Sequence, residues 1–179
     1  MEEYRSSLRK EIIMKQLLFS SDGNWEGFIL RITLGGIMLP HGLQKMFGLF
    51  GGYGFKSTVD FFTKSMNLPW LIAVLIVLAE FFGSALLLAG LGSRLCAIVF
   101  IVIMIGAIIT TNYSNGLFMN WFGNQKGEGI EYHLLVIAIC VTILLVGSGK
   151  FSIDQAITKL WAEHELSSLI IKGVKQLSN

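Results

Sequence analysis

The sequence predicts an all-α integral membrane protein, a four-helix transmembrane bundle with amphipathic terminal segments. The first observation is composition: 53% of the residues are hydrophobic, only 15% are charged, and the mean hydropathy is +0.64. Soluble domains average about a quarter charged residues. The second is that the apolar residues gather in four stretches close to the roughly 20 residues that one helical crossing needs. The third is that no alternating pattern of about ten residues is present, so helices are expected rather than strands.

The length of 179 residues leaves room for one membrane domain and no separate soluble domain. We expect that domain at residues 25–149, after a cytoplasmic lead-in at 1–24 and before a cytoplasmic tail at 150–179. The only apolar run of the lead-in, Ile12 to Phe19, is interrupted by Lys15 and Gln16. It is too short and too polar for a signal peptide. The lead-in is either an amphipathic helix on the membrane surface or a partly ordered polar segment.

Four crossings are expected along the membrane domain. They run from Trp25 to Leu43, from Leu68 to Leu91, from Leu95 to Thr111 and from Ile130 to Val146. An even number of crossings places both termini on one side. That side carries nine of the 14 Lys and Arg residues, the opposite side carries four, and Arg31 lies within the first crossing. The positive-inside rule therefore predicts cytoplasmic termini.

The tail after Lys150 returns to a soluble composition. Ser152 and Gln155 have the spacing of a capping box, and the apolar residues that follow fall on one helical face. We expect this helix to lie along the cytoplasmic membrane surface, with Trp161 at headgroup depth. The alternative is that the same face docks a partner.

Two charged residues inside the expected crossings, Arg31 and Glu80, require an explanation. A charge at the centre of a crossing costs about 2.5 to 3.5 kcal/mol on insertion scales. Each charge shares a helical face with small residues: Gly27, Arg31 and Gly35 on the first helix, and Ala73, Val77, Glu80 and Ser84 on the second. We therefore expect these two faces to pack closely and the two charges to pair. Such a pair has two interpretations: it fixes helix packing, or it lines a polar cavity for a ligand headgroup or a proton path.

A second group of polar residues is expected at the opposite end of the bundle. It contains His41, Lys45, Glu128, Glu131 and His133. Imidazole and carboxylate groups hold divalent metals or relay protons, but no HxxxH or ExxH pattern lies on one helix. We therefore expect a hydrogen-bonded network at the membrane surface and no metal site.

Two polar loops at the same end are expected to fold back over the mouth of the bundle. One runs from Asn112 to Gly129 and includes Asn120, and the other runs from Phe47 to Phe55. Amide side chains can satisfy buried backbone groups, and Trp and Phe suit the membrane interface. Together the loops are expected to cap a ligand pocket.

Several functional classes find no support in the sequence. A net charge of +2 without a long basic run gives little attraction for nucleic acid. Cys96 and Cys140 form no CxxC pair, which argues against a self-contained dithiol oxidoreductase. No haem, flavin or thiol motif is present, and no catalytic residue can be assigned.

Short motifs spread over residues 29–154 resemble a known family. They are Arg31; His41 to Lys45 with Phe47, Gly48, Gly51 and Gly52; Glu80 to Gly83; Gly90 to Arg94; Asn115 and Gly116 with Glu128, Gly129, Glu131 and His133; and Gly149 to Asp154. Each motif is weak alone, but together they are similar to the DoxX family of small prokaryotic membrane proteins. The long terminal segments depart from the resemblance.

The resemblance implies four membrane helices in a prokaryotic plasma (inner) membrane and an association with redox chemistry. The family shares its name with a subunit of an archaeal thiosulfate:quinone oxidoreductase, and most members have no assigned activity. The leading hypothesis is a membrane subunit, without activity of its own, that contacts a quinone through Arg31, Glu80 and the rim formed by His41, Glu131 and His133. Its partners would be the lipid bilayer and a redox protein that supplies electrons.

Two hypotheses from other classes stay open. The same buried charges would serve a transporter of small solutes or protons, although no inverted repeat is visible and a homo-oligomer would then be needed. In a structural scaffold, Arg31 and Glu80 would only hold the helices together.

Overall fold

The computed structural model describes residues 19, 21 and 23–163, and this part of the chain is helical without a strand. The lead-in at 1–18 and the tail beyond 163 lie outside the described residues. The elements are α2 (Trp25–Phe47), η1 (Leu49–Gly51), α3 (Gly54–Lys64), α4 (Trp70–Ala89), α5 (Ser93–Ala107), the π-helical turn η2 (Ile108–Asn112), η3 (Tyr113–Asn115) and α6 (Glu131–Val146), followed by a helix at 153–163. The predicted all-α class is confirmed.

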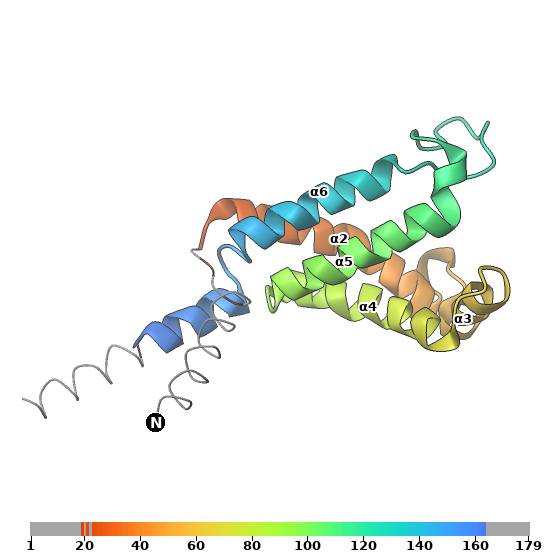
Figure 1. The fold of residues 1–179 in the computed structure, drawn as a ribbon. Helices are drawn as coiled ribbons and strands as arrows, with labels where there is room; N and C mark the ends of the chain where they lie inside the picture. The colour runs from red at the N-terminus through yellow and green to blue at the C-terminus, as the bar shows by residue number, and fades with distance from the viewer. Residues whose placement is uncertain (1–18, 20, 22, 164–179) are drawn as a thin grey trace, which may run out of the picture.

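The four long helices pack as two pairs, α2 with α4 and α5 with α6, and the pairs contact each other through α4 with α5 and α2 with α6. In Figure 1, one end of this bundle carries α3 and the loop between η3 and α6. The start of α2, the turn between α4 and α5, and the segment after α6 meet at the other end. We call these the α3 end and the knot end.

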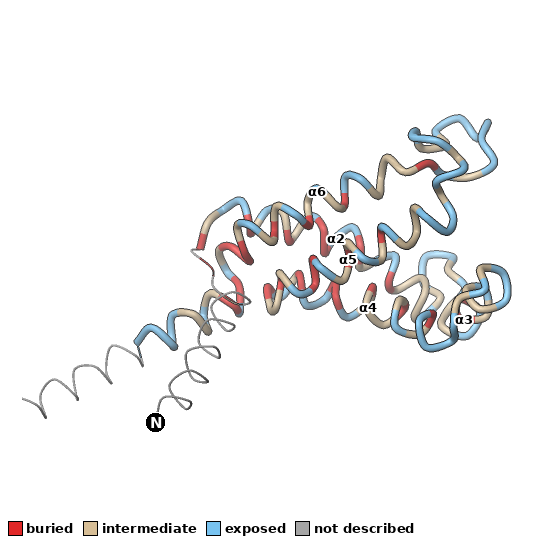
Figure 2. Tube along the Cα trace, in the orientation of Figure 1, coloured by how far each residue is buried: buried red, intermediate tan, exposed pale blue. Residues whose placement is uncertain are grey.

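Two of the helices are long and apolar enough to cross a membrane. They are Trp70–Ala89, with 20 residues, and Ser93–Asn115, with 23 residues, which joins α5 to η2 and η3. Apolar side chains such as Leu75 and Val102 are exposed on their outer faces, and Figure 2 shows buried positions alternating with exposed ones along both helices. The helix α6 is apolar but shorter, at 16 residues. The 23-residue helix α2 contains Glu26, Arg31 and Lys45.

Two glycines let α2 and α4 approach closely: Gly35, which belongs to the predicted stripe, and Gly42, which does not, whereas Gly27 of that stripe packs against the backbone after α6. A Cβ atom added to Gly42 would lie 2.7 Å from the Cα atom of Phe81, and one added to Gly35 would lie 3.1 Å from the Ser84 carbonyl oxygen. On α4 the predicted small-residue stripe faces inward, since Ala73, Val77, Glu80 and Ser84 are all buried. Close backbone contact of this kind is typical of helix pairs that cannot use the hydrophobic effect between them.

Arg31 holds three segments together at the knot end. Its side chain is only 1% exposed, and all of its hydrogen bonds in the structure go to backbone carbonyl oxygens. Nη1 donates to Leu87 and Leu88 at 3.1 and 2.6 Å, at the last turn of α4. Nε donates to Ser148 at 2.8 Å, and Nη2 donates to Lys150 and Phe151 at 2.9 and 2.7 Å.

This arrangement uses the full donor capacity of a guanidinium, which has five N–H groups. The last carbonyls of any helix lack partners within the helix, and Arg31 supplies them for α4. It does the same for the turn that follows α6. A buried cation thereby becomes the hydrogen-bonding centre of the knot end, and no carboxylate among the described residues is hydrogen-bonded to it.

Asp154 completes the knot end. It is buried and accepts hydrogen bonds from the backbone N–H groups of Gly92 and Ser93, at 2.8 and 3.2 Å, and from the Ser148 hydroxyl. A carboxylate at this place satisfies free donors at the start of α5 and interacts favourably with the helix dipole. The predicted Ser152 cap is also present, because its Oγ accepts from the Gln155 N–H at 3.1 Å.

Replacing Arg31 should therefore destabilise the protein strongly. We expect Arg31→Met to lower the free energy of unfolding by about 3 kcal/mol or more, because several buried carbonyl groups lose their donors together. Arg31→Lys should recover only a minor part, since a single ammonium cannot reach carbonyls spread around a planar fork. Thermal unfolding in detergent measures both changes.

The matched control is Lys56→Met, which removes an exposed cation on α3. It should alter stability by no more than about 0.5 kcal/mol. Full stability of Arg31→Lys would show that the charge, rather than the five-donor geometry, is what matters at this position.

Candidate functional site

Glu80, the buried acidic residue of α4, forms an ion pair with Lys45. One carboxylate oxygen of Glu80 accepts from the Lys45 ammonium. The Glu80 side chain is 3% exposed and that of Lys45 is 30% exposed, so the pair lies just inside the surface. The neighbouring Ser84 hydroxyl donates to the Glu80 backbone carbonyl. Pairing avoids the large cost of an isolated charge in apolar surroundings.

The predicted pairing of Arg31 with Glu80 is wrong, and the register of α2 against α4 explains why. The backbone of α2 touches that of α4 at Gly42, beside Glu80 and Phe81. Lys45 follows Gly42 within one turn and reaches Glu80. Arg31 lies about 21 Å from Lys45 along the helix axis, beside the other end of α4.

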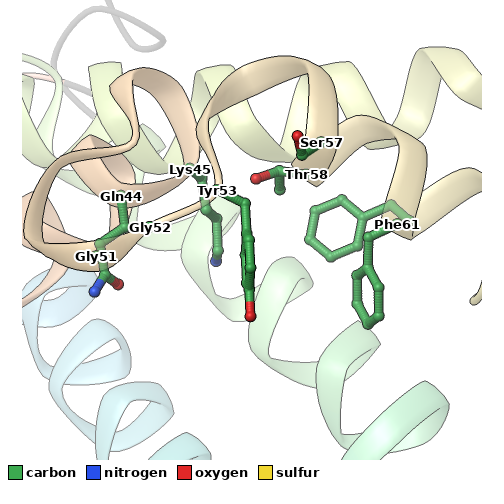
Figure 3. Close-up of a pocket in the computed structure, with 9 residues that line it drawn as sticks. Gln44, Lys45, Gly51, Gly52, Tyr53, Ser57, Thr58 and Phe61 are labelled. Carbon is green, nitrogen blue, oxygen red and sulfur yellow. The ribbon is translucent and has the colours of Figure 1, made fainter.

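A pocket of about 530 Å³ adjoins the Lys45 side chain at the α3 end of the bundle (Figure 3). This volume lies in the range of about 300 to 1,000 Å³ that is usual for small-molecule sites. It is lined by Gln44, Lys45, Gly51, Gly52, Tyr53, Ser57, Thr58, Phe61 and Phe62. The end of α2, the turn after it and one face of α3 thus form its walls.

Polar groups with free hydrogen-bonding capacity face this pocket. Thr58 is only 7% exposed. Neither its hydroxyl nor that of Ser57 makes a hydrogen bond within the described part of the chain. Lys45 donates one N–H to Glu80, and a lysine ammonium has three. Tyr53 and Phe61 add aromatic surface to the lining, and Figure 3 draws Tyr53 next to Lys45.

Most of these lining residues were not predicted from the sequence. The segment from Phe47 to Phe55 was expected to cap a pocket, and it does contribute Gly51, Gly52 and Tyr53. The helix α3 was not expected. Its signal is visible in retrospect: Phe55, Val59 and Phe62 recur at helical spacing and pack toward the core.

The remaining polar residues predicted at this end do not form one network. His41 is exposed, and its ring centroid lies 6.3 Å from that of Tyr132. The Tyr132 hydroxyl donates to the Met38 sulfur at 3.2 Å. Nδ1 of His133 is buried and has no hydrogen-bond partner among the residues that the structure describes. Neither histidine lines the pocket.

The two acidic residues predicted in the polar group at this end, Glu128 and Glu131, hold a loop instead. Its ends are joined by the backbone hydrogen bond from Glu131 N–H to the Leu117 carbonyl, at 2.8 Å. The Glu128 carboxylate accepts from the Asn120 N–H at 2.7 Å, and the Glu131 carboxylate accepts from the Met119 N–H at 3.2 Å. The Asn120 side chain exchanges two hydrogen bonds with the Gln125 backbone, at 3.0 and 3.2 Å.

The prediction that this loop folds back over the pocket is wrong. Its backbone finds partners in its own side chains, and none of its residues lines the pocket. Phe122 at its tip is 87% exposed. In Figure 1 the loop projects away from the bundle beyond α6.

No three His, Cys, Asp or Glu side chains of the described residues come together as metal ligands do. Cys96 and Cys140 are buried and unpaired with each other. The pocket beside Lys45 and Glu80 is therefore the site with the most complete set of ligand-binding features in the described chain.

Comparison with known proteins finds one matching family model and one similar protein. Residues 27–113 match the family model DoxX. The chain is 31% identical over 131 residues to a Bacillus subtilis (strain 168) protein named "Putative oxidoreductase CatD", and the match covers 73% of this chain and 86% of that protein. No solved structure is significantly similar to the chain. This chain belongs to the DoxX family.

Proposed function

We propose that this protein is a four-span membrane subunit of a quinone-linked redox complex, with both termini in the cytoplasm of a prokaryotic cell. The pocket beside Lys45 and Glu80 would hold the quinone ring, and a partner protein would supply the electrons. The observation that carries the proposal is the buried ion pair placed at the wall of a partly aromatic pocket.

The structure supports a membrane crossing by α2 as well as by the two longest apolar helices. With 23 residues, α2 is long enough to cross. Its charges do not prevent this: Glu26 and Lys45 lie near its ends, and Arg31 is fully hydrogen-bonded to carbonyl groups. The 16-residue α6 would extend to about 24 Å, which is short for a crossing and suits a locally thinner bilayer.

The redox part of the proposal is supported by the relative named an oxidoreductase and by the chemistry of the pocket. Pockets for small organic ligands combine apolar walls with a few polar groups that fix orientation. Here Phe61 and Phe62 supply apolar surface, and Lys45 supplies hydrogen-bond donors beside a carboxylate.

The contacts of Arg31 support the alternative hypothesis, in which buried charges only hold the helices together. Arg31 has no free donor and is far from the pocket, which favours a purely structural role for it. Lys45 differs, because 30% of its side chain is exposed and it lines a cavity.

The direct test is purification of the full chain from native membranes in a mild detergent, followed by quinone extraction and identification of co-purifying proteins. We expect bound quinone and a redox partner with the unaltered chain. The double variant Lys45→Met/Glu80→Gln leaves no buried charge unpaired, so it should lose the quinone and keep the fold, whereas Lys56→Met, on the exposed side of α3, should retain the quinone. An intact bundle that carries neither quinone nor partner would refute the proposal.

The ion pair itself predicts a coupling between its two members. Glu80→Gln should destabilise the protein by about 2 to 3 kcal/mol, somewhat less than for a fully buried pair, because Lys45 is partly exposed. Adding Lys45→Met should restore much of this loss, since no charge then remains unpaired. The measurement is a double-mutant cycle of thermal unfolding in detergent. Simple additivity of the two single effects would show that the pair is not coupled in the membrane protein.

A further inference from the structure

We infer that the pocket at the α3 end selects a neutral, flat ring that carries a carbonyl oxygen, held by the Lys45 ammonium and the Thr58 hydroxyl. This inference rests on the proposed function, because a quinone ring is a member of that class, but it goes further in naming the selecting groups. Four features of the pocket lead to it: its charge, its unused donors, its walls and its rigid back.

The first feature is the charge balance of the pocket. Lys45 is the one charged residue among its lining residues, and the Glu80 carboxylate neutralises it from behind. A carboxylate or phosphate ligand would have to compete with Glu80 for the same ammonium, and would leave Glu80 without its partner in apolar surroundings. Uncompensated buried charge is strongly unfavourable, so a neutral ligand is favoured over an anion.

The second feature is the set of donors that the fold leaves unused. A threonine in a helix usually bonds its hydroxyl to a carbonyl one turn earlier, as Thr63 does to Val59 at 2.9 Å on the same helix. Thr58 is 93% buried and makes no such bond within the described residues. The hydroxyl is not one of the fully enclosed polar atoms that lack a partner, so it is accessible at the pocket surface and is free to bond to a ligand.

The Lys45 ammonium offers further donors in the same pocket. One N–H is directed to Glu80, which leaves two for a ligand oxygen. An ammonium can only donate, and a hydroxyl can donate as well as accept, so both groups match a carbonyl acceptor. Binding requires only these hydrogen bonds; no covalent bond forms or breaks.

The third and fourth features concern shape. Phe61, Phe62 and Tyr53 give the pocket aromatic surface on which a flat ring can stack. The back wall is closed by backbone contact, because a Cβ atom on Gly52 would lie 2.6 Å from the Cα atom of Gln44. An aliphatic chain of the same volume would leave the free donors without partners, which is the usual basis of rejection by a polar site.

The test is equilibrium dialysis of the full chain in detergent with 2,3-dimethyl-1,4-naphthoquinone, against empty micelles. This probe has no open quinone ring position for a thiol to attack, so Cys96 and Cys140 cannot capture it. Thr58→Val keeps the shape and removes the hydroxyl. We expect Thr58→Val, and the double variant Lys45→Met/Glu80→Gln that leaves no charge unpaired, each to weaken binding by about five- to tenfold, the usual effect of one lost hydrogen bond.

Matched variants control for folding. Thr63→Val alters a hydroxyl on the same helix that already has an internal partner, and it should leave binding unchanged. Thr58→Ser restores a hydroxyl and should bind like the unaltered chain. Equal binding by Thr58→Val and the unaltered chain would overturn the assignment of Thr58.

Two further probes test the ligand class. The hydrocarbon 2,3-dimethylnaphthalene should bind at least about fivefold more weakly than the quinone, because it lacks the carbonyl acceptors. The anion 2-naphthoate should also bind more weakly than the quinone. Tighter binding of the anion would overturn the neutral-ligand assignment.

The outcomes separate this inference from the proposed function. Probe binding that depends on Thr58, in a protein that carries no native quinone or partner, supports the site and refutes the redox-subunit proposal. Native quinone that co-purifies, together with probe binding insensitive to Thr58, overturns the site and leaves the proposal standing.

Discussion

The fold depends on one side chain that joins three segments far apart in the sequence. Arg31 donates to the last turn of α4 and to the segment after α6, so that the first part of α2 and the ends of α4 and α6 meet in a common hydrogen-bonded centre. In a membrane the hydrophobic effect cannot hold helices against each other, because lipid is as apolar as their side chains. Buried backbone carbonyls at helix ends also have no water molecules with which to form hydrogen bonds. A buried guanidinium meets both needs, which explains why a costly charge is retained there.

Glu80, the second buried charge within the four long helices, is stabilised in a different way from Arg31. Glu80 lies at the other end of the bundle and has a lysine as its partner, and part of that lysine faces a pocket. Arg31 has every donor occupied, whereas Lys45 has donors to spare. The two cations of α2 therefore have different roles. Arg31 joins the helix ends by hydrogen bonds, and Lys45 keeps N–H donors that a ligand in the pocket can use. The difference follows from their side chains, because a planar five-donor fork suits scattered carbonyls and a mobile ammonium suits a site that must exchange partners.

The sequence predicts the helices of this protein better than their contacts. Hydropathy locates α4, α5 and α6 to within a few residues, and the inward stripe of α4 follows from its small residues. The partner of Glu80 could not be predicted, because depth estimates along single helices do not reveal the register between them. That register is set by Gly42, whose contact with Phe81 depends on the three-dimensional path of both helices. The acidic residues Glu128 and Glu131 resemble ligands in sequence, yet they bond to the backbone of their own loop. The short helix α3 was hidden because it follows a run of glycines.

The pocket lies at the end of the bundle opposite to Arg31 and Asp154. At the knot end, Arg31 and Asp154 satisfy free backbone groups and fix the turns. Each end also contains a phenylalanine whose φ of 53° is unusual for a residue with a side chain, Phe151 at the knot end and Phe50 at the α3 end. A hydrogen bond of 3.1 Å from the Gln44 amide to the Phe50 carbonyl holds this strained turn in place. Strain of about 1 to 3 kcal/mol persists only where surrounding structure enforces it, and it is concentrated at functional sites. Gln44 lines the pocket as well, so a ligand there contacts the residue that maintains the turn.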